Sequence, residues 1–255
     1  MKMLKLRMRY FAAAVVAVAG AACAPIPAGT PPQSNAAATA PSVAIGDNWT
    51  YRVRDGFGGL ERGSQRFRVT EAGNGRIQVA VSREGVSVDE IQIYDREWNW
   101  LKHPATHLQS FDYSPAYPAF AFPLAPGKTW RARLTATDPV SGRRFPLTVD
   151  GVAVGWERVK VPAGEFDAIK IKRTVFFDYL DFGVRGRSEI LEYEWYVPAV
   201  KQAVRREASA MYLSYLSGKG GSSSFLHAAG RDGGGGPRFV RDDWLIWELV
   251  SYSVR

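Results

Sequence analysis

The strongest constraint on this chain is a two-residue alternation of apolar and polar side chains that runs through most of its length. From Val43 onward, aromatic and β-branched residues fall in short runs in which about every second side chain is apolar. Successive side chains of a β-strand point to opposite faces of a sheet, so this period predicts strands with one face in the core and one in water. A helix needs a period near 3.6 residues, and no long segment shows it.

Ten segments carry the strand pattern. They are residues 49–55, 66–71, 76–83, 87–94, 130–137, 145–159, 166–179, 188–197, 203–216 and 243–254. Asn74-Gly75 separates the second segment from the third, and this dipeptide favours the positive φ angles of a type I′ hairpin turn. Long antiparallel strands in succession suit a large curved sheet or a partly open β-barrel. The sequence therefore predicts an all-β domain of about ten strands with little helix.

The faces of two segments are informative. In 166–179 one face is predicted to be core, and it carries Ile169, Ile171, Arg173, Val175 and Phe177. In 243–254 apolar groups occupy both faces around residues 244–250, so this strand is predicted to be buried on two sides or to border a cavity.

Residues 1–22 have the features of a secretory signal peptide. Four basic residues precede an apolar stretch of about a dozen residues, which is too short for a membrane anchor. Gly20, Ala21 and Ala22 lead directly into Cys23, the only cysteine, and this arrangement resembles a bacterial lipobox. The resemblance implies export and acylation of Cys23. Simple cleavage, giving a soluble periplasmic protein, is the alternative.

Residues 23–42 are predicted to be the lipidated cysteine followed by a flexible tether. The segment after Cys23 consists mainly of Ala, Pro, Ser, Thr and Gly and has no charge, so it cannot bury enough surface to fold. Ala24 stands where inner-membrane lipoproteins of many Gram-negative bacteria carry Asp. The resemblance therefore implies anchoring to the outer membrane, facing the periplasm, with residues 43–255 forming a single β domain.

Charge and composition argue against a nucleic-acid partner. The formal charge is +8, but the signal segment contributes four of the 33 basic residues, which leaves 29 against 25 acidic ones. A surface with a net charge of +4 and no basic run is weak support for binding a polyanion.

Two segments interrupt the strand pattern. Residues 217–237 are rich in Gly and Ser and are predicted to form a loop. Residues 103–127 contain several prolines and aromatic side chains, and they are predicted to be an irregular lid over one end of the sheet or an aromatic mouth that contacts a ligand or partner. His103 and His107 lie in this segment and are predicted to be solvent-exposed, so no metal site and no cofactor is expected.

Four segments together resemble exported bacterial proteins with a YmcC-like fold. They are GDNWTYRV (46–53), PLAPGKTW (123–130), VPAGEFDAIKI (161–171) and EWYVPAVKQAVRRE (194–207). The resemblance implies an antiparallel sheet curled into a partial barrel, loosely akin to the half-barrels of lipoprotein carriers such as LolA and LolB. It implies no activity and no catalytic residues.

Three functions are compatible with these features. The first is a non-catalytic envelope lipoprotein that binds an apolar or lipid-like ligand in its concave sheet, and it requires a cavity of about 300 Å³ or more. The candidate ligand-binding residues are Trp195, Trp244, Trp247, Phe177 and Tyr193.

The second function is a scaffolding lipoprotein that binds another envelope protein through residues 103–127 or 217–237. The third is a polysaccharide hydrolase that uses Glu192 and Glu194, which would lie about 7 Å apart on one strand face. Alternate glutamates also occur on any exposed strand face, so we expect the pair to be solvated and the protein not to be an enzyme.

Overall fold

The computed structural model describes residues 36–104, 110–181, 184–214 and 238–255. The predicted signal peptide, Cys23 and the loop 217–237 lie outside these residues. The described residues all belong to one compact unit, Pro31–Arg255.

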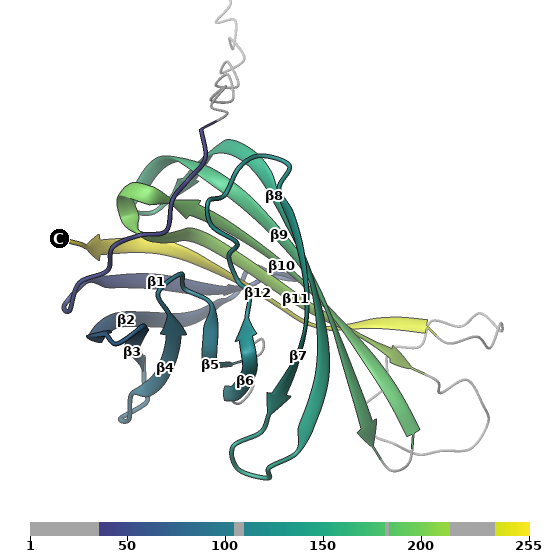
Figure 1. Cartoon of the computed structure of the whole chain (residues 1–255). Helices are drawn as coiled ribbons and strands as arrows, with labels where there is room; N and C mark the ends of the chain where they lie inside the picture. The colour runs from purple at the N-terminus through teal and green to yellow at the C-terminus, as the bar shows by residue number, and fades with distance from the viewer. Residues whose placement is uncertain (1–35, 105–109, 182–183, 215–237) are drawn as a thin grey trace, which may run out of the picture. The chain divides into compact units, whose positions relative to one another are not determined.

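Twelve strands occupy the described residues (Figure 1). The first six are β1 (Asn48–Asp55), β2 (Glu61–Gly73), β3 (Arg76–Arg83), β4 (Glu90–Asp95), β5 (Trp100–Pro104) and β6 (Ser110–Tyr117). The others are β7 (Thr129–Thr137), β8 (Arg144–Val161), β9 (Gly164–Asp181), β10 (Val184–Val197), β11 (Gln202–Ser214) and β12 (Arg238–Ser253). A single 3₁₀ turn, η1 (Pro198–Val200), lies between β10 and β11, so the all-β prediction is confirmed.

The strands form one antiparallel sheet that closes on itself. Each strand pairs with its neighbours in sequence, and β1 also pairs with β12 over Asn48–Asp55, which makes a closed barrel. The prediction of a large curved antiparallel sheet or partly open barrel of about ten strands is therefore confirmed. The structure adds that the barrel is closed and that it has two further strands. Closure satisfies the backbone hydrogen bonds of both end strands.

The two additional strands correct the prediction of an irregular lid over residues 103–127. β5 ends at Pro104 and β6 covers Ser110–Tyr117, so part of this segment belongs to the barrel wall. β6 is hard to recognise from the sequence, because Pro115 has no N–H to donate and proline is uncommon inside strands. In the structure, β6 pairs with β7 only over Asp112–Ser114. Phe111, Tyr113 and Tyr117 nevertheless alternate with polar residues and are buried.

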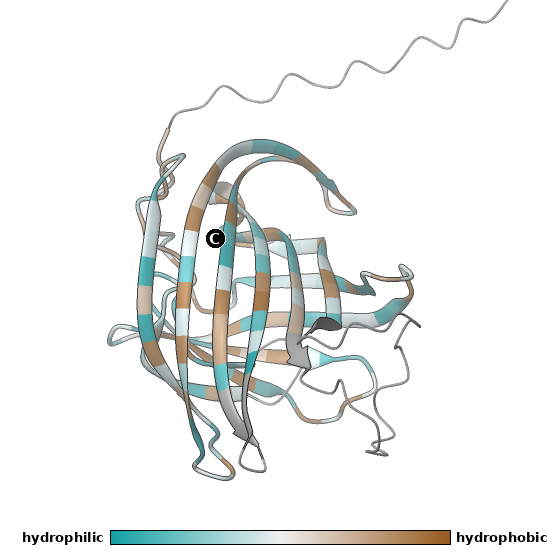
Figure 2. Cartoon of the chain, turned by 90° about the vertical axis from the view of Figure 1, so that its right-hand side faces the viewer, coloured by the Kyte–Doolittle hydropathy of each residue, from teal (hydrophilic) through white to brown (hydrophobic). Residues whose placement is uncertain are grey.

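Alternation of hydropathy along the long strands is visible in Figure 2, where brown and teal residues follow one another along each ribbon. On β9 four of the five residues predicted to face the core are buried, since Ile169, Ile171, Arg173 and Val175 are at most 2% exposed, and the fifth, Phe177, is partly buried. Among the described residues, no helix is long and apolar enough to cross a membrane.

One end of the barrel interior is closed by two tryptophans. Trp49 and Trp98 pack edge to face with their ring centroids 5.8 Å apart. The indole of Trp49 donates to the carbonyl of Val200 at 2.9 Å, and that of Trp98 donates to the carbonyl of Lys201 at 3.0 Å. A buried indole N–H needs a partner, so these bonds fix the β10–β11 connection over this end.

The same end holds the chain that enters β1. Ala38 forms a bridge with Leu124 through two backbone hydrogen bonds of 2.8 and 2.7 Å, and it is 3% exposed. The indole of Trp156 donates to the carbonyl of Ala36 at 2.8 Å. The described part of the predicted tether is therefore attached to the barrel from Ala36 onward.

The β2–β3 turn has the predicted geometry. Asn74 and Gly75 have φ angles of +48° and +80°, as a type I′ turn requires. A methyl group at Gly75 would meet no atom within 4 Å, so its cost arises from the backbone alone.

We expect Gly75→Ala to lower the free energy of unfolding by about 1 to 2 kcal/mol, because a side chain disfavours the left-handed region. Urea denaturation of the full chain measures this change. Gly73→Ala is the matched control, since Gly73 also has open space around it but lies in β2 without a positive φ. Equal losses in the two variants would contradict the assigned turn.

Candidate functional site

A cavity of about 430 Å³ lies inside the barrel, and this size falls within the range of small-molecule sites. Side chains from β1 to β5 and from β10 to β12 line it, so both the first and the last strands of the barrel contribute to its wall. The lining is rich in aromatic rings, namely Tyr51, Phe67, Tyr94, Trp98, Trp100, Phe120 and Trp247.

A three-ring stack forms part of the cavity wall. Trp100 lies between His103 and Tyr117, with centroid distances of 3.8 and 4.1 Å and interplanar angles of 13° and 9°. All three side chains are buried. Because neighbouring strands hold the rings in contact, this part of the wall is pre-formed for a flat or apolar ligand surface.

Arg206 on β11 extends into the same region. Its guanidinium carbon lies 5.0 Å from the ring centroid of Trp100 and 5.1 Å from that of Trp247. Both distances allow cation–π attraction, which is stronger where water is excluded. The two indoles therefore hold an arginine at the cavity surface.

Arg206 belongs to a buried ionic network. Arg173 donates from Nε to Glu192 and from Nη2 to Glu194, both at 2.8 Å, and its side chain is 0% exposed. Arg206 donates to Glu192 at 3.2 Å and lies 3.5 Å from Glu194. The Tyr117 hydroxyl donates to Glu192 at 2.7 Å. Two positive and two negative charges thus balance inside the barrel.

This network corrects the expectation that Glu192 and Glu194 lie on a solvated face. They are 2% and 5% exposed and point into the barrel, because they share the face of β10 that packs beside Arg173 and Arg206. Burial alone would raise the pKa of Glu192, but the arginine charges and the hydrogen bond from Tyr117 outweigh it and lower the pKa to about 2. A glycosidase general acid needs a raised pKa, so Glu192 does not fit that role.

His103 is also placed differently from the prediction. It is 4% exposed, and its Nδ1 donates to the carbonyl of Pro104 at 2.7 Å. Burial and the charge of Arg206 hold the pKa of His103 well below its usual value, so the ring is neutral at physiological pH. His107 and His227 lie outside the described residues. In the part of the chain that the structure describes, no group of three or more His, Cys, Asp or Glu residues is arranged to hold a metal ion.

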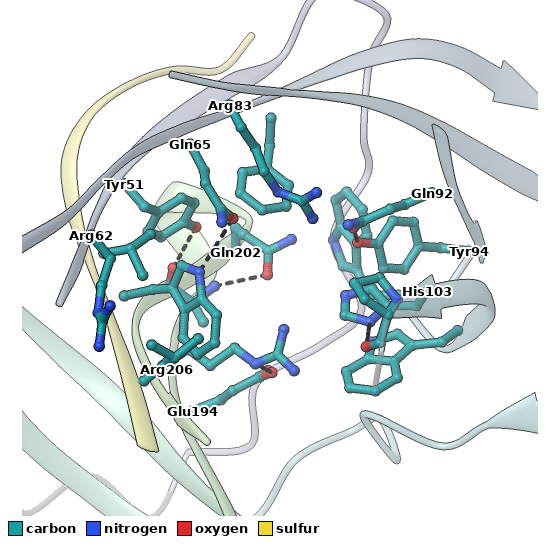
Figure 3. A pocket seen from close by; sticks show the side chains of 18 of the residues that line it. Tyr51, Arg62, Gln65, Arg83, Gln92, Tyr94, His103, Glu194, Gln202 and Arg206 are labelled. Atoms are coloured by element: carbon teal, nitrogen blue, oxygen red, sulfur yellow. Dashed lines mark hydrogen bonds and ion pairs between the residues drawn. The ribbon is translucent and has the colours of Figure 1, made fainter. Parts of the chain in front are cut away.

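Polar side chains occupy fixed positions around the cavity (Figure 3). The Tyr51 hydroxyl donates to the carbonyl of Ala203 at 2.7 Å, and the Tyr94 hydroxyl donates to Oε1 of Gln92 at 2.5 Å. Burial raises the pKa of Tyr51 well above its usual value, so this hydroxyl remains a donor. Such bonds set which polar groups are left to face a ligand.

Of the five residues predicted to bind a ligand, Trp247 lines the cavity. Phe177 faces the barrel interior but packs on Phe111 and Phe145 outside the cavity lining. Tyr193 and Trp195 lie on the face of β10 opposite the two glutamates, where Lys170 sits over both rings at 5.3 and 4.8 Å.

The fifth residue, Trp244, lies next to Leu245 and therefore on the opposite face of β12 from the cavity. Its ring packs edge to face against Phe57 at a centroid distance of 5.8 Å.

Most cavity residues were missed by the sequence analysis. Tyr51 and Gln65 lie on predicted strands or their extensions, but alternation alone did not select them as ligand contacts. Alternation on β10 did not indicate that Glu192 and Glu194 face inward, because the opposite face carries Leu191, Tyr193, Trp195 and Val197 and is the more apolar of the two.

Comparison with protein-family models and with curated proteins finds no match. Solved structures with a similar fold include a candidate lipoprotein from Parabacteroides distasonis, with 14% identity, a TM-score of 0.49 and coverage of 86% of this chain and 100% of that chain. An exported protein with a YmcC-like fold from Bacteroides fragilis has 14% identity, a TM-score of 0.43 and the same coverage.

The hypothetical lipoprotein YmcC from Escherichia coli has 10% identity and a TM-score of 0.41, over 80% of this chain and 84% of that chain. These neighbours are proteins of the kind that the four sequence segments resemble. Their names state no ligand and no activity.

The ionic network predicts acid sensitivity. The folded pKa of Glu192, about 2, lies below its ordinary value of 4.5, so its stabilising contribution is present above about pH 4.5 and is lost as the pH falls towards 2. The difference corresponds to about 3 kcal/mol.

We expect Glu192→Gln to remove this part of the acid-induced loss of unfolding free energy, measured by urea denaturation between pH 7 and pH 2.5. Glu165→Gln is the matched control, because Glu165 is an exposed side chain on β9. If the two variants give the same pH profile, the buried network does not carry the effect.

Proposed function

We propose that this chain is a non-catalytic lipoprotein of the bacterial cell envelope that binds an amphiphilic, lipid-like ligand inside its barrel. The observation that carries the proposal is the 430 Å³ cavity, which remains open although Trp247, Trp100 and Phe120 all contribute to its wall. Its mixture of aromatic rings with a few fixed polar groups is typical of small-molecule sites.

A non-catalytic role is supported by the chemistry of the cavity. The carboxylates Glu192 and Glu194 are held by Arg173 and Arg206, so neither is free to act as a general acid or a nucleophile. The neutral ring of His103 is stacked on Trp100 and hydrogen-bonded to Pro104.

Export and anchoring rest on the sequence before the barrel. The proposed anchor is an acylated Cys23 in the outer membrane. Cys23 precedes Ala36 in the sequence, and the carbonyl of Ala36 accepts a hydrogen bond from Trp156 of the barrel. Two or more acyl chains give stable membrane binding, whereas a single chain does not.

We expect native protein to fractionate with membranes and Cys23→Ala to appear in the soluble fraction, because the variant lacks the acceptor for the lipid. Mass spectrometry of the native protein then reports the acyl mass on Cys23. A Cys23→Ala variant that remains in the membrane fraction to the same extent would refute the anchor.

Filling the cavity is the direct test of ligand binding. Leu245 lines the cavity, whereas Val250 on the same strand is 42% exposed. We expect Leu245→Trp to weaken binding of dodecyl amphiphiles at least about tenfold, because the larger side chain occupies the ligand volume, and Val250→Trp to leave it unchanged.

The measurement is calorimetric titration of the full chain with two twelve-carbon probes, dodecanoate and dodecylammonium. If neither probe binds, or if Leu245→Trp binds both as well as the unaltered protein does, the proposed cavity function is wrong.

A further inference from the structure

The hydrogen bonds around the cavity leave mainly donors facing it. Gln65 and Gln202 lie on β2 and β11, and both side chains line the cavity. The indole of Trp247 donates to Oε1 of Gln65 at 3.2 Å, and the backbone N–H of Ala203 donates to Oε1 of Gln202 at 2.9 Å. Both carbonyl oxygens are therefore engaged, and within the described residues neither amide nitrogen donates a hydrogen bond.

Tyr51 contacts the surroundings of both glutamines. Tyr51 pairs with Gln65 across the β1–β2 ladder, and its hydroxyl reaches the carbonyl of Ala203, the neighbour of Gln202. Figure 3 shows Gln202 and Arg83 pointing into one open space beside Gln65 and Arg206. Four donor-bearing side chains thus surround the same volume.

The arginines have spare donors as well. A guanidinium carries five N–H groups. Arg206 donates from Nη2 to Glu192, and its buried Nε lies 3.5 Å from Oε1 of Glu194, so Nη1 is its nitrogen that forms no hydrogen bond or ion pair among the described residues. Arg83 donates from Nη2 to Glu90, and its other nitrogens form no hydrogen bond in the described part of the chain.

The acceptors of the cavity are fewer and mostly used. Oε1 of Gln92 is taken by Tyr94, and Oε1 of Glu194 is paired with both Arg173 and Arg206, whereas Oε2 of Glu194 forms no hydrogen bond among the described residues. Asp243 also lines the cavity, but it lies six residues along β12 from Leu249, which pairs with Tyr51. At about 3.3 Å per residue, its backbone lies about 20 Å along the strand from Leu249 and about 13 Å from Trp247, whose indole bonds to Gln65.

We propose that the ligand carries a carboxylate at the end of its apolar part, and that this carboxylate lies against the side-chain amides of Gln65 and Gln202 and the guanidinium of Arg206. The inference rests on the proposed function and names the head group of that ligand. A carboxylate only accepts hydrogen bonds, so it satisfies these donors, and its bonds to a guanidinium are charge-assisted.

An ammonium head group is the informative contrast. It only donates, so it would leave the amide and guanidinium N–H groups unpaired in a space from which water is displaced. Sites built from hydrogen-bonding groups discriminate strongly against molecules that leave those groups unpaired.

The experiment compares dodecanoate with dodecylammonium at neutral pH by calorimetric titration of the full chain. Both probes have twelve carbons, and their alkyl chains differ by one methylene, which favours dodecylammonium if it is buried, so a preference for dodecanoate arises from the head group. We expect dodecanoate to bind at least about tenfold more tightly. Equal affinities, or tighter binding of the ammonium, would overturn the carboxylate inference while leaving the cavity function in place.

Gln202→Glu is the decisive variant. It keeps the oxygen that accepts from Ala203 and replaces the NH₂ group by a second acceptor. We expect dodecanoate affinity to fall at least about tenfold and the preference for dodecanoate over dodecylammonium to shrink or reverse. Gln65→Glu makes the same exchange on β2, keeps the bond from Trp247, and provides a second test if Gln202→Glu does not fold.

Gln78→Glu is the matched control, because Gln78 lies on the other face of β3 and donates to Thr70 away from the cavity. Its affinity for both probes should equal that of the unaltered protein. Unchanged dodecanoate affinity in a folded Gln202→Glu or Gln65→Glu variant would overturn the inference. Failure of both probes to bind the unaltered protein would overturn the proposed function as well.

Discussion

Closure of the sheet by the pairing of β1 with β12 is the interaction on which the rest of the structure depends. Asn48–Asp55 pair with Leu245–Ser253, so this ladder joins segments that lie far apart in the sequence. Once this ladder forms, alternate side chains of every strand face one enclosed interior. The cavity exists because of it, since Tyr51 and Gln65 come from the beginning of the domain and Arg206 and Trp247 from its end.

The enclosed interior has a polar centre. Placing Arg173, Glu192, Glu194 and Arg206 inside a barrel is costly unless each charge is paired and hydrogen-bonded, and the short contacts among them meet that condition. Removing one partner would leave a buried charge unpaired, so the four side chains act as a unit. The network also positions Arg206 against Trp100 and Trp247, which links the stability of the centre to the chemistry of the cavity wall.

The site itself combines apolar surface with directed donors. Aromatic rings provide most of the contact area, while the bonds that Gln65 and Gln202 accept from their own neighbours determine which of their atoms face the ligand. The proposed lipid-like ligand and its carboxylate follow from these two properties together. The proposal depends on the residues of this chain alone.

The sequence by itself determined the strand period, the type I′ turn at Asn74-Gly75 and the inward face of β9, because these depend on side-chain alternation and local backbone preference. Tertiary structure decided what local patterns do not encode. It added β6, which the sequence did not predict because Pro115 is unusual in a strand. It also placed Glu192 and His103 inside the barrel, whereas the sequence predicted that both are exposed to solvent. The sequence pattern does not show on which face of a strand a charged or aromatic residue lies. Closure of the barrel brings in partners from distant strands and so fixes which face is buried.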